Sequence, residues 1–137
     1  MSTDELTITQ AVAFAALYAL DQETSESWKV WAHAWLKGND RSGTSAQAAA
    51  MTAITAPARH AATAARLLSE ANAIHTEGLM LAAENRNSVW HLDTFEQRNA
   101  QCLDEVAQAL RPASGGDLLD PDSPRARELR AKVTAEF

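Results

Sequence analysis

Residues 57–110 form the longest stretch of this chain with one continuous helical periodicity, and they constrain the fold most strongly. Positions three and four residues apart are mostly apolar or small, as the buried side of an α-helix requires. They are Ala64, Leu67, Ala71, Ile74, Gly78, Leu81, Asn85, Ser88, Leu92, Phe95, Asn99, Cys102, Val106 and Ala109. Because Arg66, Glu70 and Glu77 occupy the opposite side, we expect long amphipathic helices here.

Two structures fit this stretch. In the first, residues 85–88 form a turn between two antiparallel helices, since Asn and Ser favour caps and turns over helix interiors. In the second, one helix runs through, and Asn85, Ser88 and Asn99 become polar positions in the seam of a coiled coil. The preference of Asn and Ser for caps favours the hairpin, and Gly78 would mark a close approach of helices or a break that ends the first helix at Glu77.

Composition places the rest of the chain in the all-α class. Hydrophobic residues make up 46% of the 137 residues and aromatic ones only 6%, because alanine, the best helix former, dominates. No strand-like alternation is present. We therefore predict a compact helical bundle of about five helices around a long central helical hairpin or one long helix. We expect residues 1–111 to form the bundle domain, and residues 112–137 to form a turn-rich linker and a short C-terminal helix docked on it.

Capping signals predict where the other helices begin and end. A Ser or Thr followed three residues later by Glu or Gln is a capping box, and Gly or Pro marks an end. The first expected helix begins at a capping box of Ser2 and Glu5 and runs to about Leu20, and the second covers residues 26–37 and ends before Gly38. The third begins at a capping box of Thr44 and Gln47 and ends at Pro57. The last helix begins at Ser123 and Pro124.

Three of the four tryptophans supply the first candidate binding surface. Trp28, Trp31 and Trp35 fall at i, i+3 and i+7 and therefore share one helix face. Such a row suits a hot spot for a protein partner or one wall of an aromatic cage for a cation. Core packing is the favoured interpretation, because an alanine-rich protein needs its large rings inside.

A second candidate surface lies within residues 85–99, which are dense in polar and aromatic side chains. On a helix, several of them would share one side and suit an interface or a small polar ligand. A capped helix start with a solvated face explains the same pattern. The candidate residues are Asn87, Trp90, His91, Asp93, Thr94 and Gln97.

The sequence carries no recognisable catalytic, metal or cofactor motif. No two histidines are four residues apart, no nucleophile elbow is present, and the glycines form no phosphate-binding loop. Cys102 is expected to be a buried or half-buried thiol. No segment is strongly basic, which argues against nucleic-acid binding, and no apolar run suits a membrane span, so we expect a soluble cytoplasmic protein.

Residues 31–38 and the following alanine-rich segment with Arg59 and His60 resemble alanine-rich helical proteins classed as bacterial toxin-immunity proteins. The resemblance covers about a third of the chain and implies a helical inhibitor. We expect a small non-catalytic interaction domain of inhibitor, immunity or adaptor type that binds a protein partner or a second copy of itself. The alternatives are a small-molecule-binding bundle or enzyme with a pocket near Trp90, His91 and Asp93, and a structural coiled-coil oligomer.

Overall fold

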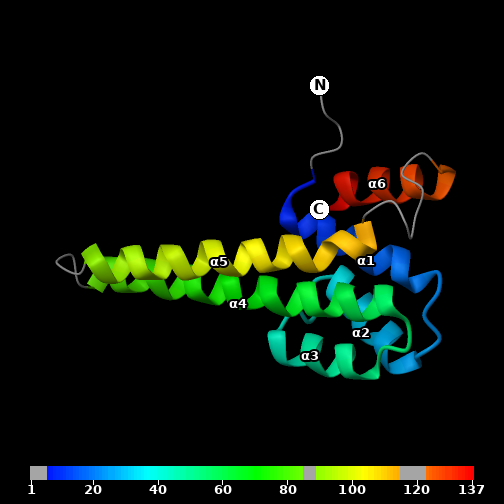
Figure 1. The fold of residues 1–137 in the computed structure, drawn as a ribbon, viewed down its shortest axis with the longest axis horizontal. Coiled ribbons are helices and arrows are strands. Elements are labelled where there is room, and N and C mark those ends of the chain that lie inside the picture. The colour runs from blue at the N-terminus through cyan, green and yellow to red at the C-terminus, as the bar shows by residue number, and fades with distance from the viewer. Residues whose placement is uncertain (1–5, 85–88, 115–122) are drawn as a thin grey trace.

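A computed structural model describes residues 6–84, 89–114 and 123–137 of the chain, with the backbone alone at 81, 82, 84, 89–95 and 111–114. Six helices and no strand occur in these ranges, which confirms the all-α prediction (Figure 1). The helices are α1 (Ile8–Leu20), α2 (Glu26–Leu36), α3 (Gly43–Thr52), α4 (Ala56–Glu84), α5 (Val89–Ser114) and α6 (Pro124–Glu136).

Helix α1 lies at the centre of the bundle. Its residues from Val12 to Ala19 are all buried, as expected for a segment that is apolar on every side. It contacts α2, α4, α5 and α6, while α3 packs against α2 and α4. Because alanines form much of this core, the helices approach closely and the few large rings and leucines fill the remaining space.

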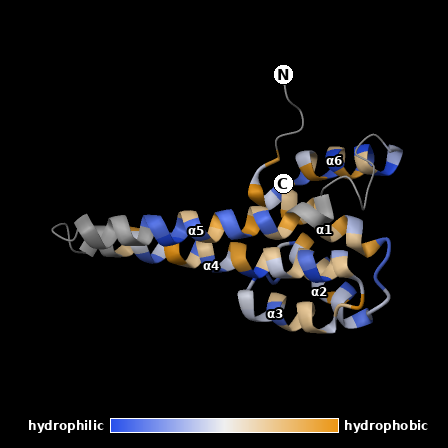
Figure 2. Ribbon diagram, viewed as in Figure 1, coloured by the Kyte–Doolittle hydropathy of each residue, from blue (hydrophilic) through white to orange (hydrophobic). Residues whose placement is uncertain are grey.

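The long stretch folds as a hairpin rather than as one helix. Helices α4 and α5 run antiparallel and pack against each other along their length (Figure 1). The predicted stripe is buried from Ala64 to Gly78, and hydrophobic and polar segments alternate along both helices (Figure 2). Helix α4 continues past Gly78, so this glycine marks a buried helix contact and not a helix end. The predicted turn, residues 85–88, lies outside the described residues.

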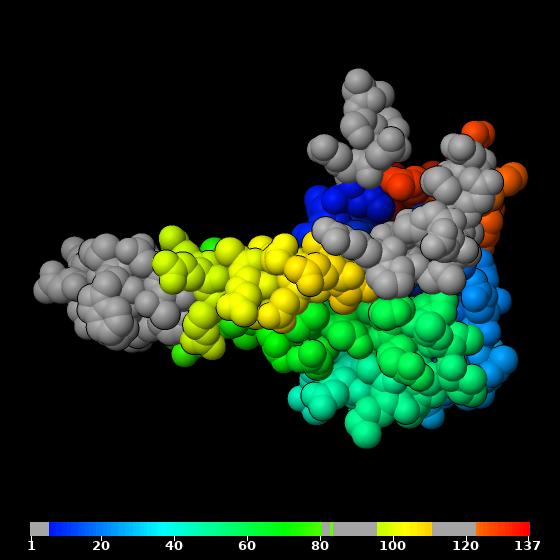
Figure 3. Space-filling view, in the orientation of Figure 1, coloured from blue at the N-terminus to red at the C-terminus, as the bar shows by residue number. Residues whose placement is uncertain are grey.

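Part of the hairpin extends beyond the other helices. We call residues 75–84 of α4 and 89–98 of α5 the arm (Figure 1), and its coloured atoms extend away from the other helices in the space-filling view (Figure 3). The body consists of α1, α2, α3, α6 and the remainder of the hairpin. In the parts of the chain described above, no helix is both long and apolar enough to cross a membrane.

Hydroxyl side chains cap five of the described helices. At the start of α4, the Thr55 hydroxyl accepts from the backbone N–H of Ala58 at 3.3 Å. The other four hydroxyl groups each accept a hydrogen bond from the backbone N–H three residues later, while their own backbone is extended. These N-caps are Thr7, Ser25, Ser42 and Ser123. The prediction at Ser123 and Pro124 is confirmed. The box predicted at Thr44 and Gln47 is wrong, because Ser42 caps α3 instead.

The start of α1 also differs from the sequence-based expectation. Thr7 and Gln10 form a complete capping box, with each side chain bonded to the other residue's backbone N–H. The helix therefore begins at Ile8, whereas the box expected at Ser2 and Glu5 lies outside the described residues. Helix α2 ends as predicted, with Lys37 as C-cap and Gly38 at a φ of 79°.

Buried Glu23 ties the α1–α2 connection to the α3–α4 connection. Its carboxylate accepts from the backbone N–H groups of Ser25, Ile54 and Thr55 and from the Thr55 hydroxyl, at 2.7–3.1 Å. Burial alone would raise the pKa of Glu23, but these hydrogen bonds outweigh it and hold the pKa below its usual value of 4.5. The carboxylate thus fixes the N-terminus of α4, where the helix dipole also favours an anion.

The C-terminal helix packs on the body through an apolar seam. Ala126, Leu129 and Val133 of α6 are buried, and α6 contacts α1. Arg125 also forms a bidentate ion pair with Asp21, in which both hydrogen bonds are 2.8 Å long. Helix α5 extends to Ser114, so the segment expected to be a linker from residue 112 begins in fact as helix.

Candidate functional site

The tryptophan face of α2 is turned into the protein. Trp28 is fully buried, Trp35 is 1% exposed and Trp31 is 6% exposed, so this face packs against the body. The indole N–H of Trp28 donates to the carbonyl oxygen of Ala58 at 3.0 Å, and its ring meets that of Trp31 with centroids 5.6 Å apart. This burial favours the core interpretation for Trp28.

Trp35 belongs to an aromatic and cationic stack that joins α2 to the end of α6. Its ring stacks on Phe137 at a centroid distance of 6.3 Å, and the guanidinium of Arg41 lies over both rings. Arg41 also donates from Nε to the carbonyl oxygen of Trp35 at 2.8 Å, at the C-terminal end of α2. These contacts account for Trp35 as a structural residue.

Trp31 differs from its two neighbours in one respect. Its indole nitrogen is buried, yet it has no hydrogen-bond acceptor among the described residues. Leaving a buried donor unpaired costs about 1–3 kcal/mol, and such groups are uncommon in native structures. Trp31 is also the most exposed of the three, because its ring forms part of the wall of a surface groove.

This groove lies between α2 and α3 and has a volume of about 310 Å³. Its walls are mostly apolar and small, and Val30, which is 67% exposed, lies at its edge. We call it the α2–α3 groove. Its lining residues are Ser27, Val30, Trp31, Ala34, Asp40, Ser45, Ala48, Ala49 and Thr52.

Asp40 supplies the charge of the groove. Its carboxylate accepts from the backbone N–H of Ser42, the Ser42 hydroxyl and the Ser45 hydroxyl, at 2.6–3.1 Å. The hydrogen bond from the Ser45 side chain, followed by the two from Ser42, lowers the pKa of Asp40 below its usual value. The group is therefore an anion at neutral pH, next to the N-terminus of α3.

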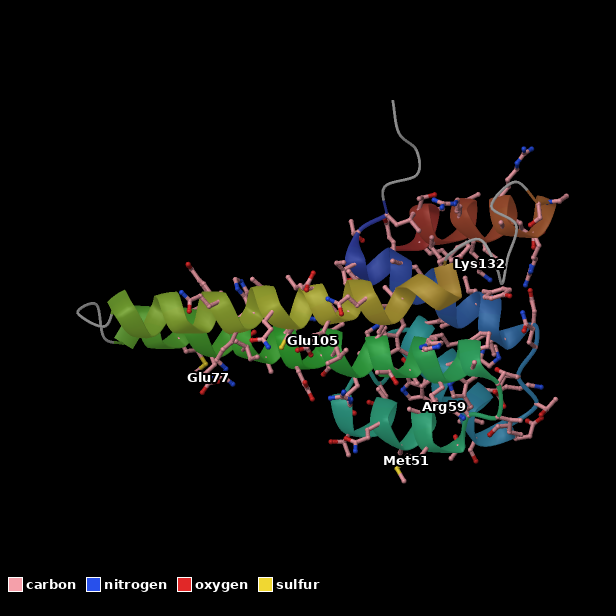
Figure 4. The ribbon with its side chains drawn as sticks, viewed as in Figure 1. Met51, Arg59, Glu77, Glu105 and Lys132 are labelled. Atoms are coloured by element: carbon pink, nitrogen blue, oxygen red, sulfur yellow. The ribbon has the colours of Figure 1, made fainter. Side chains whose placement is uncertain are left out.

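A second hollow lies between α3 and α4 and is more polar. Gly43, Thr44, Gln47 and Ser69 line it together with the ion pair of Arg66 and Glu70, whose nitrogen and oxygen are 2.6 Å apart. Met51, which is 81% exposed, stands at its margin and projects from α3 into solvent (Figure 4). Because Arg66 and Glu70 already pair with each other, this hollow presents fewer free charged groups to a ligand than the α2–α3 groove does.

The candidate surface within residues 85–99 is described only in part. Trp90, His91, Asp93, Thr94 and Gln97 fall within helix α5, as expected, and Gln97 is exposed. Asn87 and the side chains of the first four lie outside the described residues. Whether these residues form a pocket remains a prediction.

Cys102 is half-buried, as predicted. Burial, together with the carboxylates of Glu105 and Glu70, raises the pKa of its thiol. The thiol is therefore protonated at neutral pH, and protonation makes it a poor nucleophile. Among the residues whose side chains are described, no group of three His, Cys, Asp or Glu is placed to hold a metal ion.

The sequence pointed to Trp31 but not to the groove around it. Val30 could have indicated an exposed apolar surface, since it is an apolar residue of the same predicted helix that lies beside the tryptophan face and not on it. Asp40, Ala48 and Ala49 gave none, because only the packing of α3 against α2 brings them to Trp31. No protein-family model matches this chain, and neither a curated protein nor a solved structure is significantly similar to it. The resemblance to immunity proteins gains no support from these comparisons.

Proposed function

We propose that this chain is a non-catalytic interaction domain that binds a protein partner through the α2–α3 groove. The observation that carries the proposal is Trp31, whose side chain lines an apolar groove and whose buried indole N–H has no acceptor among the described residues. A partner that shifts the groove wall and brings an oxygen atom to this nitrogen removes the cost of the unpaired donor.

The side chains around Trp31 support a protein as the ligand. Val30 exposes most of its surface at the groove edge, and burying an exposed apolar side chain stabilises a complex by about 25 cal/mol per Å². Tryptophan is also among the residues that contribute most to protein interfaces. The groove is open to solvent on one side, which suits a projecting element of a partner.

The test compares two variants with the same chemical change. Val30→Glu places a charge at the groove edge, whereas Leu79→Glu places one on the arm, where Leu79 is 57% exposed. Tagged wild-type protein and both variants are used for affinity capture from the source organism, followed by mass spectrometry. We expect a protein that wild type and Leu79→Glu retain and Val30→Glu loses.

Two results would count against the proposal. If the two variants lose the same protein equally, or only Leu79→Glu loses it, then the groove is not the binding surface. Purified protein that carries a chromophore or a bound small molecule from the cell, seen by optical absorption and mass spectrometry, would favour the small-molecule alternative instead.

A further inference from the structure

We propose that the α2–α3 groove receives an amphipathic helix of the partner that presents a Lys or Arg to Asp40. This inference rests on the proposed function and specifies the chemistry of the ligand. It combines three properties of the groove: its shape, its charge and the unpaired donor of Trp31, a residue that lines it.

The shape suits a helix of about two turns. The lining residues run from Ser27 to Ala34 in α2 and from Ser45 to Thr52 in α3, which corresponds to about 10 Å along each helix. Small side chains at Ala34, Ala48 and Ala49 let a third helix approach closely enough for its ridge to enter the groove between the two. An aliphatic side chain of the partner would then contact Val30.

The charge of the groove selects a basic helix. Among the described residues that line it, Asp40 alone is charged, and it has no ion pair with any described residue. Three hydrogen bonds hold its carboxylate, which leaves about one of its four acceptor positions for a ligand. The net charge of −6 also attracts a cationic segment from a distance.

The unpaired donor adds a polar requirement. The backbone carbonyls of a helix are bonded within the helix, so the acceptor for Trp31 must be a side-chain oxygen of the partner, as from Gln, Ser or Thr. The indole nitrogen exposes less than 1 Å². Side chains at the groove wall therefore shift slightly on binding, as is common at protein interfaces.

The probe is a synthetic alanine-based helical peptide of about 15 residues that carries Leu, Gln and Lys on one face. Its control replaces Lys by Glu. Binding is followed through the indole N–H signals of the four tryptophans in a ¹⁵N–¹H correlation spectrum, assigned with single Trp→Phe variants. We expect the Lys peptide to shift the Trp31 signal downfield and the Trp28 signal little, because Trp28 already donates to Ala58.

Two charge variants test the role of Asp40. Asp40→Asn retains an oxygen that can accept from Ser42, so α3 keeps its cap, but it removes the anion. Glu77→Gln makes the same change in net charge on the arm (Figure 4). We expect Asp40→Asn to weaken binding of the Lys peptide about tenfold and Glu77→Gln to weaken it less than about twofold.

The inference is overturned if the Lys peptide leaves the Trp31 signal unchanged, if the Glu peptide binds equally well, or if the two charge variants weaken binding equally. Each of these results leaves the proposed function testable on its own. A protein captured by wild type and lost in Val30→Glu would still assign the groove as the interface, with a ligand that is not a basic helix.

Discussion

The indole N–H of Trp28 donates to the carbonyl oxygen of Ala58 across 3.0 Å and so joins α2 to the first turn of α4. One turn further along α2, the indole N–H of Trp31 is buried without an acceptor in the described structure. The indole N–H thus makes a structural hydrogen bond in Trp28, whereas in Trp31 it has no acceptor. This difference separates the core of the protein from its candidate binding surface.

Trp28→Phe and Trp31→Phe remove the same atoms from neighbouring buried rings, and we expect them to differ in stability. Trp28→Phe loses a buried hydrogen bond, whereas Trp31→Phe removes a donor that was unpaired. The free energy of unfolding should therefore fall by about 1–3 kcal/mol more in Trp28→Phe than in Trp31→Phe. Urea unfolding followed by circular dichroism measures both, and equal losses would show that Trp31 has an acceptor after all.

Glu23→Gln should destabilise the fold because an amide has only one acceptor oxygen where the carboxylate has two. Its N–H₂ group would replace either Oε1, which accepts from the N–H groups of Ile54 and Thr55, or Oε2, which accepts from those of Ser25 and Ile54, and would face these backbone donors. We expect a loss of about 1–3 kcal/mol in the free energy of unfolding at pH 7. Thermal and urea unfolding of the variant beside wild type measure the loss. A change below about 0.5 kcal/mol would mean that Glu23 does not hold the α4 N-terminus.

The contribution of Glu23 should also depend on pH. Its pKa is lower in the folded protein than the value of 4.5 expected for the unfolded chain, so its contribution is complete above about pH 4.5. The contribution is lost as the pH falls through the lower, folded pKa. The stability difference between wild type and Glu23→Gln should therefore shrink below pH 4.5, as unfolding curves at several pH values can show. A difference that grows on acidification would contradict this assignment.

Helix α6 should depend on its apolar seam more than on its ion pair. Leu129 is 1% exposed, so Leu129→Ala should cost about 2–5 kcal/mol of unfolding free energy. The side chains of Arg125 and Asp21 are 46% and 37% exposed, so Arg125→Ala should cost less than about 1 kcal/mol. Amide hydrogen exchange in α6 reports both changes. A larger effect of Arg125→Ala would reverse this order.

Gly38→Ala tests the end of α2. The φ of 79° at Gly38 lies in the left-handed region, where a side chain is strained although no nearby atom would clash with it. We expect a loss of about 1 kcal/mol, measured by thermal unfolding. Gly43→Ala is the control, because Gly43 has no such backbone and its added Cβ would make only ordinary contacts. If both substitutions lowered the stability equally, the loss in Gly38→Ala would not come from its left-handed backbone conformation.

Periodicity in the sequence predicted the helical stretches, and the Asn and Ser residues at 85–88 favoured a hairpin over one long helix. The buried positions from Ala64 to Gly78 repeat at helical spacing, so the 3.6-residue period identifies them without knowledge of their partners. Gly38 and Pro124 were equally informative, because each has a local backbone preference. These features depend on residues close together in the chain, and the sequence therefore reveals them.

Contacts between distant residues were not predictable in this way. Glu23 bonds to backbone groups 31 and 32 residues away, and no pattern around it announces that role. The α2–α3 groove likewise needs Trp31 and Ala49 to come together, which depends on how two helices pack. Ser42 rather than Thr44 caps α3, since the Asp40 side chain holds Ser42 through two hydrogen bonds.

The most direct test of the account is site-specific photo-crosslinking in the source organism. A photoreactive phenylalanine replaces Val30 at the edge of the α2–α3 groove, and in a matched strain it replaces Leu79 on the arm. We predict one discrete protein adduct from position 30 that position 79 does not give. Absence of an adduct at position 30, or the same adduct from both positions, would contradict the claim that this protein acts by binding a partner in the groove.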